Sequence, residues 1–456
     1  NFLKGWQHWD NDRFNKVHIP SSNIEIAKKN LDVENMNEVI VAVIDSGVDV
    51  YHPSFKGRIW ENENEIPYDG IDNDGNGYID DIYGWNFLGE VEKENFELTR
   101  KYRRCGNNNL LEGESREDCY RVEKEFRKKR KKANQNLNYV SKYSNYFGKE
   151  AYNHYYNQVN FYLNPEYNPR EESINGVLYD EEWGNSNILP RDNSESHGTH
   201  VAGIIAGRKH GEISIGVNPY AKIMALRVVP EGDERASDVS RAVIYAVENG
   251  ARVINMSFGN YENTGQAELL EAFEYAAEKG VLIVHAAGND SLNINKIIHS
   301  PSRKGGSKKL LDSWIEVGSS TSTIYFNKRN QKYYVNSSLL PSSFSNYGNQ
   351  YVDLFAPGSQ IFAPVPAGKY ASMSGTSMAA PLVSGVASLL LSYKPELNAA
   401  DLKEILLKSS RIESYDVYLP NQSKGSDSER VSFSSLSKKG SVLDAYSALG
   451  YIKERY

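Results

Sequence analysis

The sequence predicts an α/β fold with a mostly parallel central sheet, helices on both of its faces, and an irregular or helical insertion. From residue 197 onward, buried-strand patterns alternate with amphipathic helix patterns, which is typical of a parallel sheet covered on both faces. Several polar side chains stand where a strand ends or a helix begins, the edge at which such sheets carry their sites. Residues 88–190 interrupt this pattern with a charged, Tyr-rich composition.

The expected elements follow in chain order. A short helix after an N-terminal arm precedes the first strand, over residues 39–44. Further strands are expected over residues 222–229, 252–258, 281–285, 314–318 and 351–355, and helices over residues 237–249, 267–279, 382–391 and 399–409. The tail beyond residue 409 has no clear pattern. Because neither internal repeats nor clear linkers occur, we expect one domain over residues 1–456, with an insertion subdomain at 88–190.

The overall composition argues against two classes of protein. A formal net charge of −7 disfavours a nucleic-acid-binding protein. No run of about 18 apolar residues occurs, so we expect no membrane span. We expect a monomer.

The predicted insertion has its own charge and carries both cysteines. Residues 101–150 contain 14 Lys and Arg against 7 Asp and Glu, and residues 116–132 suggest a charged, exposed helix. This basic run would suit an acidic partner, although such runs are more often a solvated face. Cys105 and Cys119 are read as one local disulfide in an exported protein, or as two thiols in a cytosolic one.

A serine at the start of an apolar helix is the first candidate site residue. Residues 374–381 read Ser-Gly-Thr-Ser-Met-Ala-Ala-Pro and lead into the small-sided run 382–391. Ser377 would then lie in the first helical turn, where free N–H groups and the helix dipole favour a developing anion. Taken alone, Ser377 is more often a capping residue than a nucleophile.

Two further motifs supply the partners that a serine nucleophile needs. Asp45 ends the strand over residues 39–44, and His197 opens a helix that reads His-Gly-Thr-His. A hydroxyl nucleophile needs a base within reach, and the base needs an acid that fixes its tautomer. The alternative is that His197 and His200 are metal ligands, but neither a His-Glu-x-x-His pattern nor a third ligand is evident. His200 is therefore expected to be a packed core residue.

Together, these three motifs resemble the subtilisin-like serine peptidases, in the chain order of that family. The resemblance implies that Ser377 is the nucleophile, His197 the general base and acid, and Asp45 the orienting acid. A fourth motif agrees, because the strand over residues 281–285 leads to an Ala-Gly-Asn turn ending at Asn289. Asn289 would donate its amide to the oxyanion, whereas an isolated Gly-Asn pair would be read as a turn.

The resemblance also implies where a peptide substrate binds. An extended peptide is expected to add as a strand along Ser257, Phe258 and Gly259. Gly259, Ala287 and Gly288 would surround the side chain that precedes the scissile bond, with the two glycines leaving room for it. The sequence does not reveal which side chain is preferred.

An acidic loop predicts a structural calcium site. Residues 72–80 place oxygen ligands at the first, third, fifth and ninth positions of an EF-hand-like loop, with Gly at the sixth. The predicted ligands are Asp72, Asp74, Asn76, the Tyr78 carbonyl and Asp80. Position twelve is Tyr83 instead of Glu, so Asp80 or Asp81 must supply the remaining charge. A solvated Asn/Gly turn is the alternative.

The resemblance implies a secreted serine endopeptidase that hydrolyses polypeptides, with calcium as a structural ion and no organic cofactor. The compartment is expected to be extracellular or periplasmic, with a signal peptide and a possible pro-segment absent from this chain. A latent or pseudo-peptidase, in which the insertion covers the cleft and the protein acts mainly by binding, is the alternative. Ser54 stands where many relatives carry a calcium-binding acid, which weakens the expectation of the family's usual strong calcium site.

Overall fold

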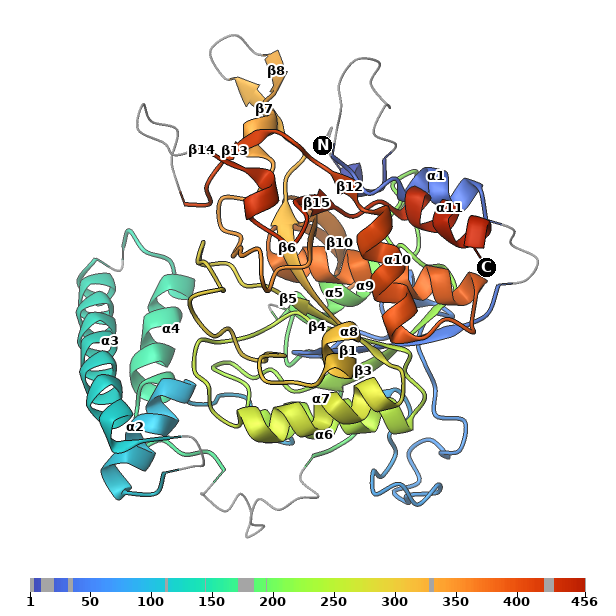
Figure 1. Ribbon diagram of the computed structural model, residues 1–456. Helices are drawn as coiled ribbons and strands as arrows, with labels where there is room; N and C mark the ends of the chain where they lie inside the picture. The colour runs from blue at the N-terminus through green and yellow to red at the C-terminus, as the bar shows by residue number, and fades with distance from the viewer. Residues whose placement is uncertain are drawn as a thin grey trace.

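The fold is built on a nine-stranded sheet, seen edge-on in the middle of the computed structural model (Figure 1). The structure describes residues 4–9, 20–31, 36–110, 114–143, 145–170, 184–193, 195–327, 332–421 and 430–455. The strand order is β12-β15-β9-β6-β5-β4-β1-β3-β2. All neighbouring strands are parallel except β12 and β15. The predicted mostly parallel α/β fold is confirmed.

The strands of this sheet are β1 (Val39–Asp45), β2 (Gly84–Asn86), β3 (Ala221–Arg227), β4 (Val253–Met256), β5 (Leu282–Ala286), β6 (Trp314–Ser320), β9 (Leu354–Pro357), β12 (Arg411–Ile412) and β15 (Ser441–Val442). Two-stranded hairpins pair β7 (Ile324–Asn327) with β8 (Lys332–Val335), β10 (Ile361–Val365) with β11 (Lys369–Met373), and β13 (Asp416–Tyr418) with β14 (Arg430–Ser432).

Helices cover both faces of the sheet because the strands are apolar on both sides. Val41 and Val43 of β1 face one core, which contains α5 (His197–Ala206) and α9 (Thr376–Tyr393). Ala42 and Ile44 face the other core, with α6 (Ala236–Glu248) and α7 (Gln266–Glu278) lying side by side. The alternation follows from the two-residue period of a strand. The remaining helices of the main body are α1 (Ile24–Lys29), α8 (Lys308–Asp312), α10 (Ala399–Ser409) and α11 (Ala445–Arg455).

A helical lobe stands to one side of the main body (Figure 1). It consists of α2 (Glu97–Asn107), α3 (Arg116–Lys142) and α4 (Lys149–Asn157), followed by one π-helical turn (Gln158–Tyr162). These helices enclose a small apolar cluster of their own, centred on Leu98, Val122 and Phe126. A disulfide between Cys105 and Cys119 joins α2 to α3, as the first reading of the two cysteines predicts.

The structure differs from the sequence-based expectation mainly at the C-terminal end. The segment beyond residue 409, which has no clear sequence pattern, forms β12 to β15 and α11, and α11 packs against α1 near the other end of the chain. Strands of two or three residues are too short to show a period. Among the described helices, α9 is long and apolar enough to cross a membrane by length and composition, but 94% of it is buried inside the protein.

Candidate active site

Asp45 and His197 meet where β1 ends and α5 begins. His197 Nδ1 lies 2.8 Å from Asp45 Oδ1, which also accepts the backbone N–H of Ser46 at 2.8 Å. The Asp45 side chain is almost fully buried, while 39% of the His197 side chain is exposed to the cleft. The acid is therefore shielded from water, and the outer edge of the imidazole remains free to face a reacting group.

The close approach of α5 to β1 depends on the residue after His197. A Cβ on Gly198 would lie 2.3 Å from the Gly47 carbonyl oxygen and 3.1 Å from Asp45 Oδ1. Any larger residue would therefore push the helix start away from the carboxylate. The motif His-Gly needs its glycine for contact between the acid and the base.

The Asp45 carboxylate controls the charge of His197. Burial alone lowers the pKa of His197, but the negative charge of Asp45 and the hydrogen bond to it outweigh burial and raise the pKa above its ordinary value of 6.5. The second carboxylate oxygen of Asp45 is buried without a hydrogen-bond partner among the described residues. Its charge is thus available to stabilise an imidazolium at His197.

Ser377 lies in the first turn of α9, as its sequence context predicts. Its hydroxyl donates to the Ser257 carbonyl oxygen at 2.9 Å, and no hydrogen bond joins it to His197 in the described part of the chain. A serine side chain has three staggered χ1 rotamers, and catalytic hydrogen bonds often tighten only when substrate is bound. The observed rotamer is therefore compatible with a role of Ser377 as nucleophile.

Asn289 follows β5 and presents its amide nitrogen to the cleft. Its Oδ1 accepts two hydrogen bonds from Thr376, one from the backbone N–H at 2.8 Å and one from Oγ1 at 3.1 Å. These two donors identify the oxygen of the amide and leave Nδ2 to donate elsewhere. Asn289 Nδ2 and Ser377 N both lie 3.6 Å from the point that a Cβ on Gly375 would occupy. Two N–H donors thus border one small space beside Ser377.

A buried polar chain connects β4 to the start of α9. Asn255 Nδ2 donates to Ser257 Oγ at 3.0 Å, and Ser257 Oγ donates to the Ser377 carbonyl oxygen at 3.1 Å. Ser384, two turns into α9, donates to Asn255 Oδ1 at 2.8 Å. This chain was not expected from the sequence. These hydrogen bonds fix the position of α9, which carries Ser377, relative to the sheet.

Comparison with known proteins agrees with this geometry. The sequence model of the Subtilase family matches residues 36–433. The chain belongs to the subtilase family. It is 34% identical to Subtilisin NAT of Bacillus subtilis subsp. natto over 237 residues, which cover 52% of this chain and 54% of that protein. It is 38% identical to Thermitase of Thermoactinomyces vulgaris over 202 residues, covering 44% and 62% of the two chains.

This subtilase spans about half the length of the first curated relatives that it matches. Among solved structures, a cold adapted subtilisin-like serine proteinase aligns with it at a TM-score of 0.47 and 23% identity, covering 91% of each chain.

The predicted peptide-binding residues lie on two sides of Ser377. Phe258 and Gly259 follow β4, and Ala287 and Gly288 follow β5; β4 and β5 are parallel neighbours in the sheet. Gly288 donates its N–H to Thr376 Oγ1 at 3.1 Å, which ties this turn to α9. A histidine that the sequence analysis did not select, His299, lies between the two glycines.

His200 is a core residue, as the sequence analysis expects. Its Nε2 lies 3.1 Å from the Ile361 carbonyl oxygen and 3.2 Å from that of Ala371, both in the β10–β11 hairpin. Burial, the main cause, and the nearby His197 lower the pKa of His200 to about 4. A neutral, hydrogen-bonded ring packed on a hairpin fits a structural role.

The acidic loop brings together a different set of carboxylates from the one predicted. Oxygen atoms of Glu65, Asp74 and Asp81 lie within 4.8 Å of one another. Asp72 instead accepts the backbone N–H groups of residues 75, 76 and 77, and Asp80 accepts those of residues 69 and 70. Of the predicted ligands, only Asp74 belongs to this carboxylate cluster. Asp81 is one of the two residues, with Asp80, that the sequence predicts to supply the remaining charge, whereas Glu65 lies outside the loop pattern and carries no sequence signal.

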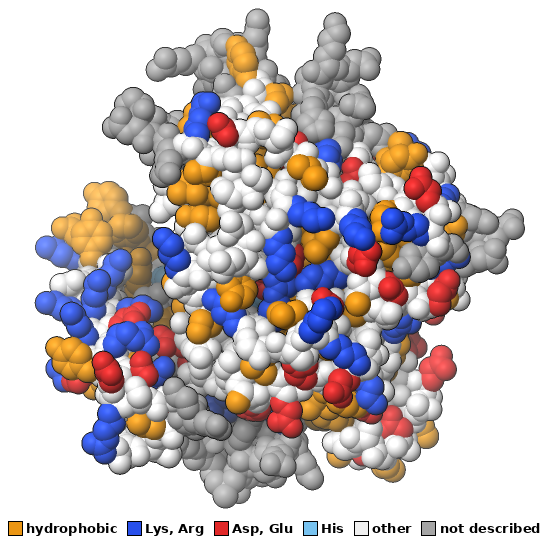
Figure 2. Space-filling view, viewed as in Figure 1, with side chains coloured by type: hydrophobic (Ala, Val, Ile, Leu, Met, Phe, Trp, Pro, Cys, Tyr) orange, Lys and Arg blue, Asp and Glu red, His pale blue; other side chains and the backbone are white. Residues whose placement is uncertain are grey.

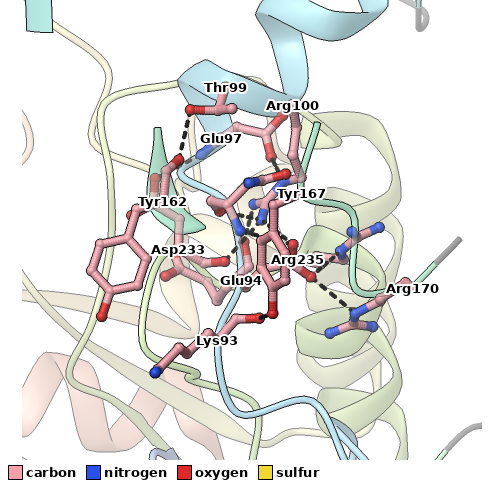
Figure 3. Close-up of polar contacts among 12 residues, drawn as sticks. Lys93, Glu94, Glu97, Thr99, Arg100, Tyr162, Tyr167, Arg170, Asp233 and Arg235 are labelled. Carbon is pink, nitrogen blue, oxygen red and sulfur yellow. Dashed lines mark hydrogen bonds and ion pairs between the residues drawn. The ribbon is translucent and has the colours of Figure 1, made fainter. Parts of the chain in front are cut away.

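A buried charge network ties the helical lobe to the segment that follows β3. Glu94 Oε2 lies 2.8 Å from Arg235 Nε and 3.1 Å from Arg170 Nε, and its Oε1 lies 3.7 Å from Arg100 (Figure 3). Arg100 also donates to the carbonyl oxygens of Asp233 and Glu234 at 3.0 and 2.8 Å. The lobe is therefore fixed to residues 233–235 by interactions shielded from water.

Proposed function

We propose that this subtilase is a serine endopeptidase that cleaves polypeptides through an acyl-enzyme at Ser377. The contact between His197 Nδ1 and Asp45 Oδ1 carries this proposal, because it leaves Nε2 as the base that faces the cleft. The position of Ser377 at the start of α9 supports its role as nucleophile. The free amide of Asn289 supports the oxyanion role.

The chemistry follows from these four residues. Ser377 Oγ attacks the peptide carbonyl carbon while His197 Nε2 takes the hydroxyl proton, and the new imidazolium is stabilised by Asp45. The oxyanion receives hydrogen bonds from Asn289 Nδ2 and Ser377 N–H. His197 then gives its proton to the leaving amine as the C–N bond breaks. Water, activated by the same histidine, hydrolyses the acyl-enzyme and frees Ser377.

A covalent probe tests this assignment. A fluorophosphonate is expected to label the wild-type protein at Ser377, and Ser377→Ala is expected to remove both labelling and peptide hydrolysis. Ser374→Ala is a matched control because Ser374 precedes α9 and its hydroxyl accepts from Gln360 N–H. Unchanged hydrolysis by Ser377→Ala contradicts the assignment. Binding of peptides without labelling of the wild type would favour the latent or pseudo-peptidase instead.

We also propose that the acidic loop binds one structural calcium ion. Three carboxylates with oxygens within 4.8 Å of one another, two of them buried, repel each other unless a cation lies among them. Burial raises the pKa of Asp81, and the charge of Asp74 raises it further, while hydrogen bonds from Tyr245, Asn62 and Asn76 oppose this. Glu65, Asp74 and Asp81 would hold the ion, and calcium would supply the positive charge that fixes residues 62–81.

We further propose that residues 88–190, of which 111–113, 144 and 171–183 lie outside the described residues, form an insertion beside the cleft, in an extracellular protein that acts as a monomer. Glu94 N–H donates to the Glu231 carbonyl oxygen at 2.8 Å, and Glu231 N–H donates to Glu92 at 2.9 Å. These bonds attach the insertion to the segment after β3, the strand that lies next to β1 and Asp45. The disulfide supports an exported protein, since such bonds persist in oxidising compartments.

A further inference from the structure

The ring of His299 lies in the space between the turn that follows β4 and the turn that follows β5. A Cβ on Gly259 would lie 2.8 Å from both Cε1 and Nε2 of His299. A Cβ on Gly288 would lie 3.0 Å from the same Nε2 and 3.2 Å from the Tyr261 hydroxyl. The room that the two glycines leave is therefore bounded by an imidazole and a phenol.

His299 is held in place from both sides. Its ring centroid lies 5.2 Å from that of His285 and 5.3 Å from that of Tyr261. The next residue, Ser300, exchanges two backbone hydrogen bonds of 2.8 Å with Asn260, which follows Gly259. Tyr261 is fixed in turn by hydrogen bonds to Asp290 and Asn346, of 2.5 and 3.0 Å. The ring of His299 is thus a rigid part of the pocket.

His285 and Glu316, next to His299, hold each other in place by a hydrogen bond. His285, His299 and Glu316 have potential ligand atoms within 4.8 Å of one another. However, His285 Nδ1 contacts Glu316 Oε1 and its Nε2 contacts the Phe258 carbonyl oxygen, both at 2.9 Å. Glu316 Oε2 accepts the Trp314 indole N–H at 2.8 Å. Both nitrogens of His285 and both oxygens of Glu316 are engaged, so this group is a support for the pocket wall.

The charge state of His299 limits which substrate side chains can bind next to it. Burial, and then the nearby His285, lower the pKa of His299 well below its ordinary value, so the ring is neutral under ordinary conditions. A neutral imidazole gives no charge to hold an acidic side chain. Its Nδ1 is buried without a hydrogen-bond partner among the described residues, and the ring lies 2.8 Å and 3.0 Å from the points that a Cβ on Gly259 and on Gly288 would occupy.

We propose that His299 is the floor of the pocket for the substrate side chain that precedes the scissile bond, and that it restricts this position to small side chains. The inference rests on the proposed peptidase function and adds its substrate class. Discrimination follows from size: an aromatic or long aliphatic side chain meets the His299 ring, whereas the methyl group of alanine does not. A misfit of one methylene or more in such a pocket changes kcat/KM by roughly tenfold or more.

Peptides that differ only in the residue before the scissile bond test this proposal. We expect the wild type to cleave the alanine peptide with a kcat/KM roughly tenfold or more above that of the phenylalanine peptide. His299→Ala is expected to raise the phenylalanine-to-alanine ratio by a similar factor. His299→Gln, which keeps most of the length and polarity, should keep the wild-type order. His154→Ala, in the exposed part of α4, is the matched control and should change nothing.

Two results would overturn the proposal: a wild type that prefers phenylalanine, or an unchanged ratio in His299→Ala. The preference for alanine over phenylalanine can also be measured on the wild type alone. The measurement is its inhibition by peptide boronic acids that end in alanine or in phenylalanine. Tighter inhibition by the phenylalanine compound contradicts the size restriction. If the peptidase assignment itself is wrong, the protein will cleave none of the peptides and will not be labelled by the fluorophosphonate.

Discussion

At the scale of single residues, the contact between Asp45 and His197 predicts how activity depends on pH. His197 must be neutral to accept the proton of Ser377, and Asp45 raises the pKa of His197 above 6.5. Activity should therefore fall as the pH is lowered through a midpoint above 6.5. In Asp45→Asn the charge that raises the pKa is lost, so the midpoint of kcat/KM should move to lower pH, while kcat falls by about 10⁴. A pH–rate profile with an unmoved midpoint in Asp45→Asn contradicts this role.

Asn289 gives a second prediction at this scale. Asn289→Ala removes one of the two donors beside Ser377, so kcat should fall by about 10²- to 10³-fold, the loss typical of subtilisins without this donor. The KM should change little, since the donor acts on the oxyanion and not on the bound peptide. Asn293→Ala is a suitable control, because it also truncates an amide in the loop after Asn289, one whose oxygen accepts only from the Asn295 N–H among the described residues. Equal losses in binding and in kcat would assign Asn289 to substrate binding.

At the scale of elements, the helical lobe depends on the charge of Glu94. Burial alone raises the pKa of Glu94, but Arg235, Arg100 and Arg170 outweigh it and lower the pKa to about 2. The carboxylate therefore stabilises the fold at any pH above its unfolded pKa of about 4.3, and this contribution is lost as the pH falls toward 2. Acid should loosen the lobe before it unfolds the main body.

Glu94→Gln tests this network directly. It leaves three guanidinium groups near an uncharged, buried amide, so we expect a loss of about 3–5 kcal/mol in the free energy of unfolding. Glu123→Gln is the control, because Glu123 pairs with Arg127 on the exposed face of α3, where such pairs contribute about 0–1 kcal/mol. Denaturant unfolding measures both variants, and limited proteolysis reports whether the lobe opens. Equal stability of the two variants would show that the network does not anchor the lobe.

The exposed face of the lobe differs from its buried base. The space-filling view shows Lys and Arg side chains and hydrophobic groups mixed on its outer side (Figure 2). Exposed tyrosines in this region include Tyr120, Tyr139 and Tyr146. This face agrees with the interpretation of the basic run in residues 101–150 as a solvated surface. The charges that anchor the lobe are those around Glu94, where the lobe meets the main body.

At the scale of the whole molecule, the sequence predicts what lies within one element and fails where distant segments meet. Asp45, His197, Ser377 and Asn289 each stand at the end of a strongly patterned strand or helix, so their placement follows from local sequence. His299 belongs to an irregular segment, and the residue that follows it, Ser300, pairs with Asn260. Glu65 joins Asp74 and Asp81 from outside the loop motif. Such contacts depend on tertiary packing, which leaves no periodic pattern in the local sequence.

The calcium proposal is also a prediction about the whole molecule, because a bound ion stabilises the entire fold by mass action. At a free calcium concentration of 100 times Kd, the gain is about 2.7 kcal/mol. A chelator should therefore lower the Tm of the wild type. Asp74→Asn should lower the Tm in calcium and respond less to the chelator, whereas Glu63→Gln, exposed and outside the cluster, should behave as the wild type.

Asp72→Asn separates the two possible ligand sets. If Glu65, Asp74 and Asp81 hold the ion, Asp72 only accepts backbone N–H groups of its own turn, and its variant should keep most of the calcium response. If the predicted loop ligands hold it, Asp72→Asn should remove the response as fully as Asp74→Asn does. A wild-type Tm that is the same in calcium and in chelator would mean that hydrogen bonds alone hold the carboxylates. Asn62 and Asn76 donate to Asp74 and Asp81, Tyr245 donates to Asp81, and the backbone N–H groups of residues 73, 74 and 80 donate to Glu65.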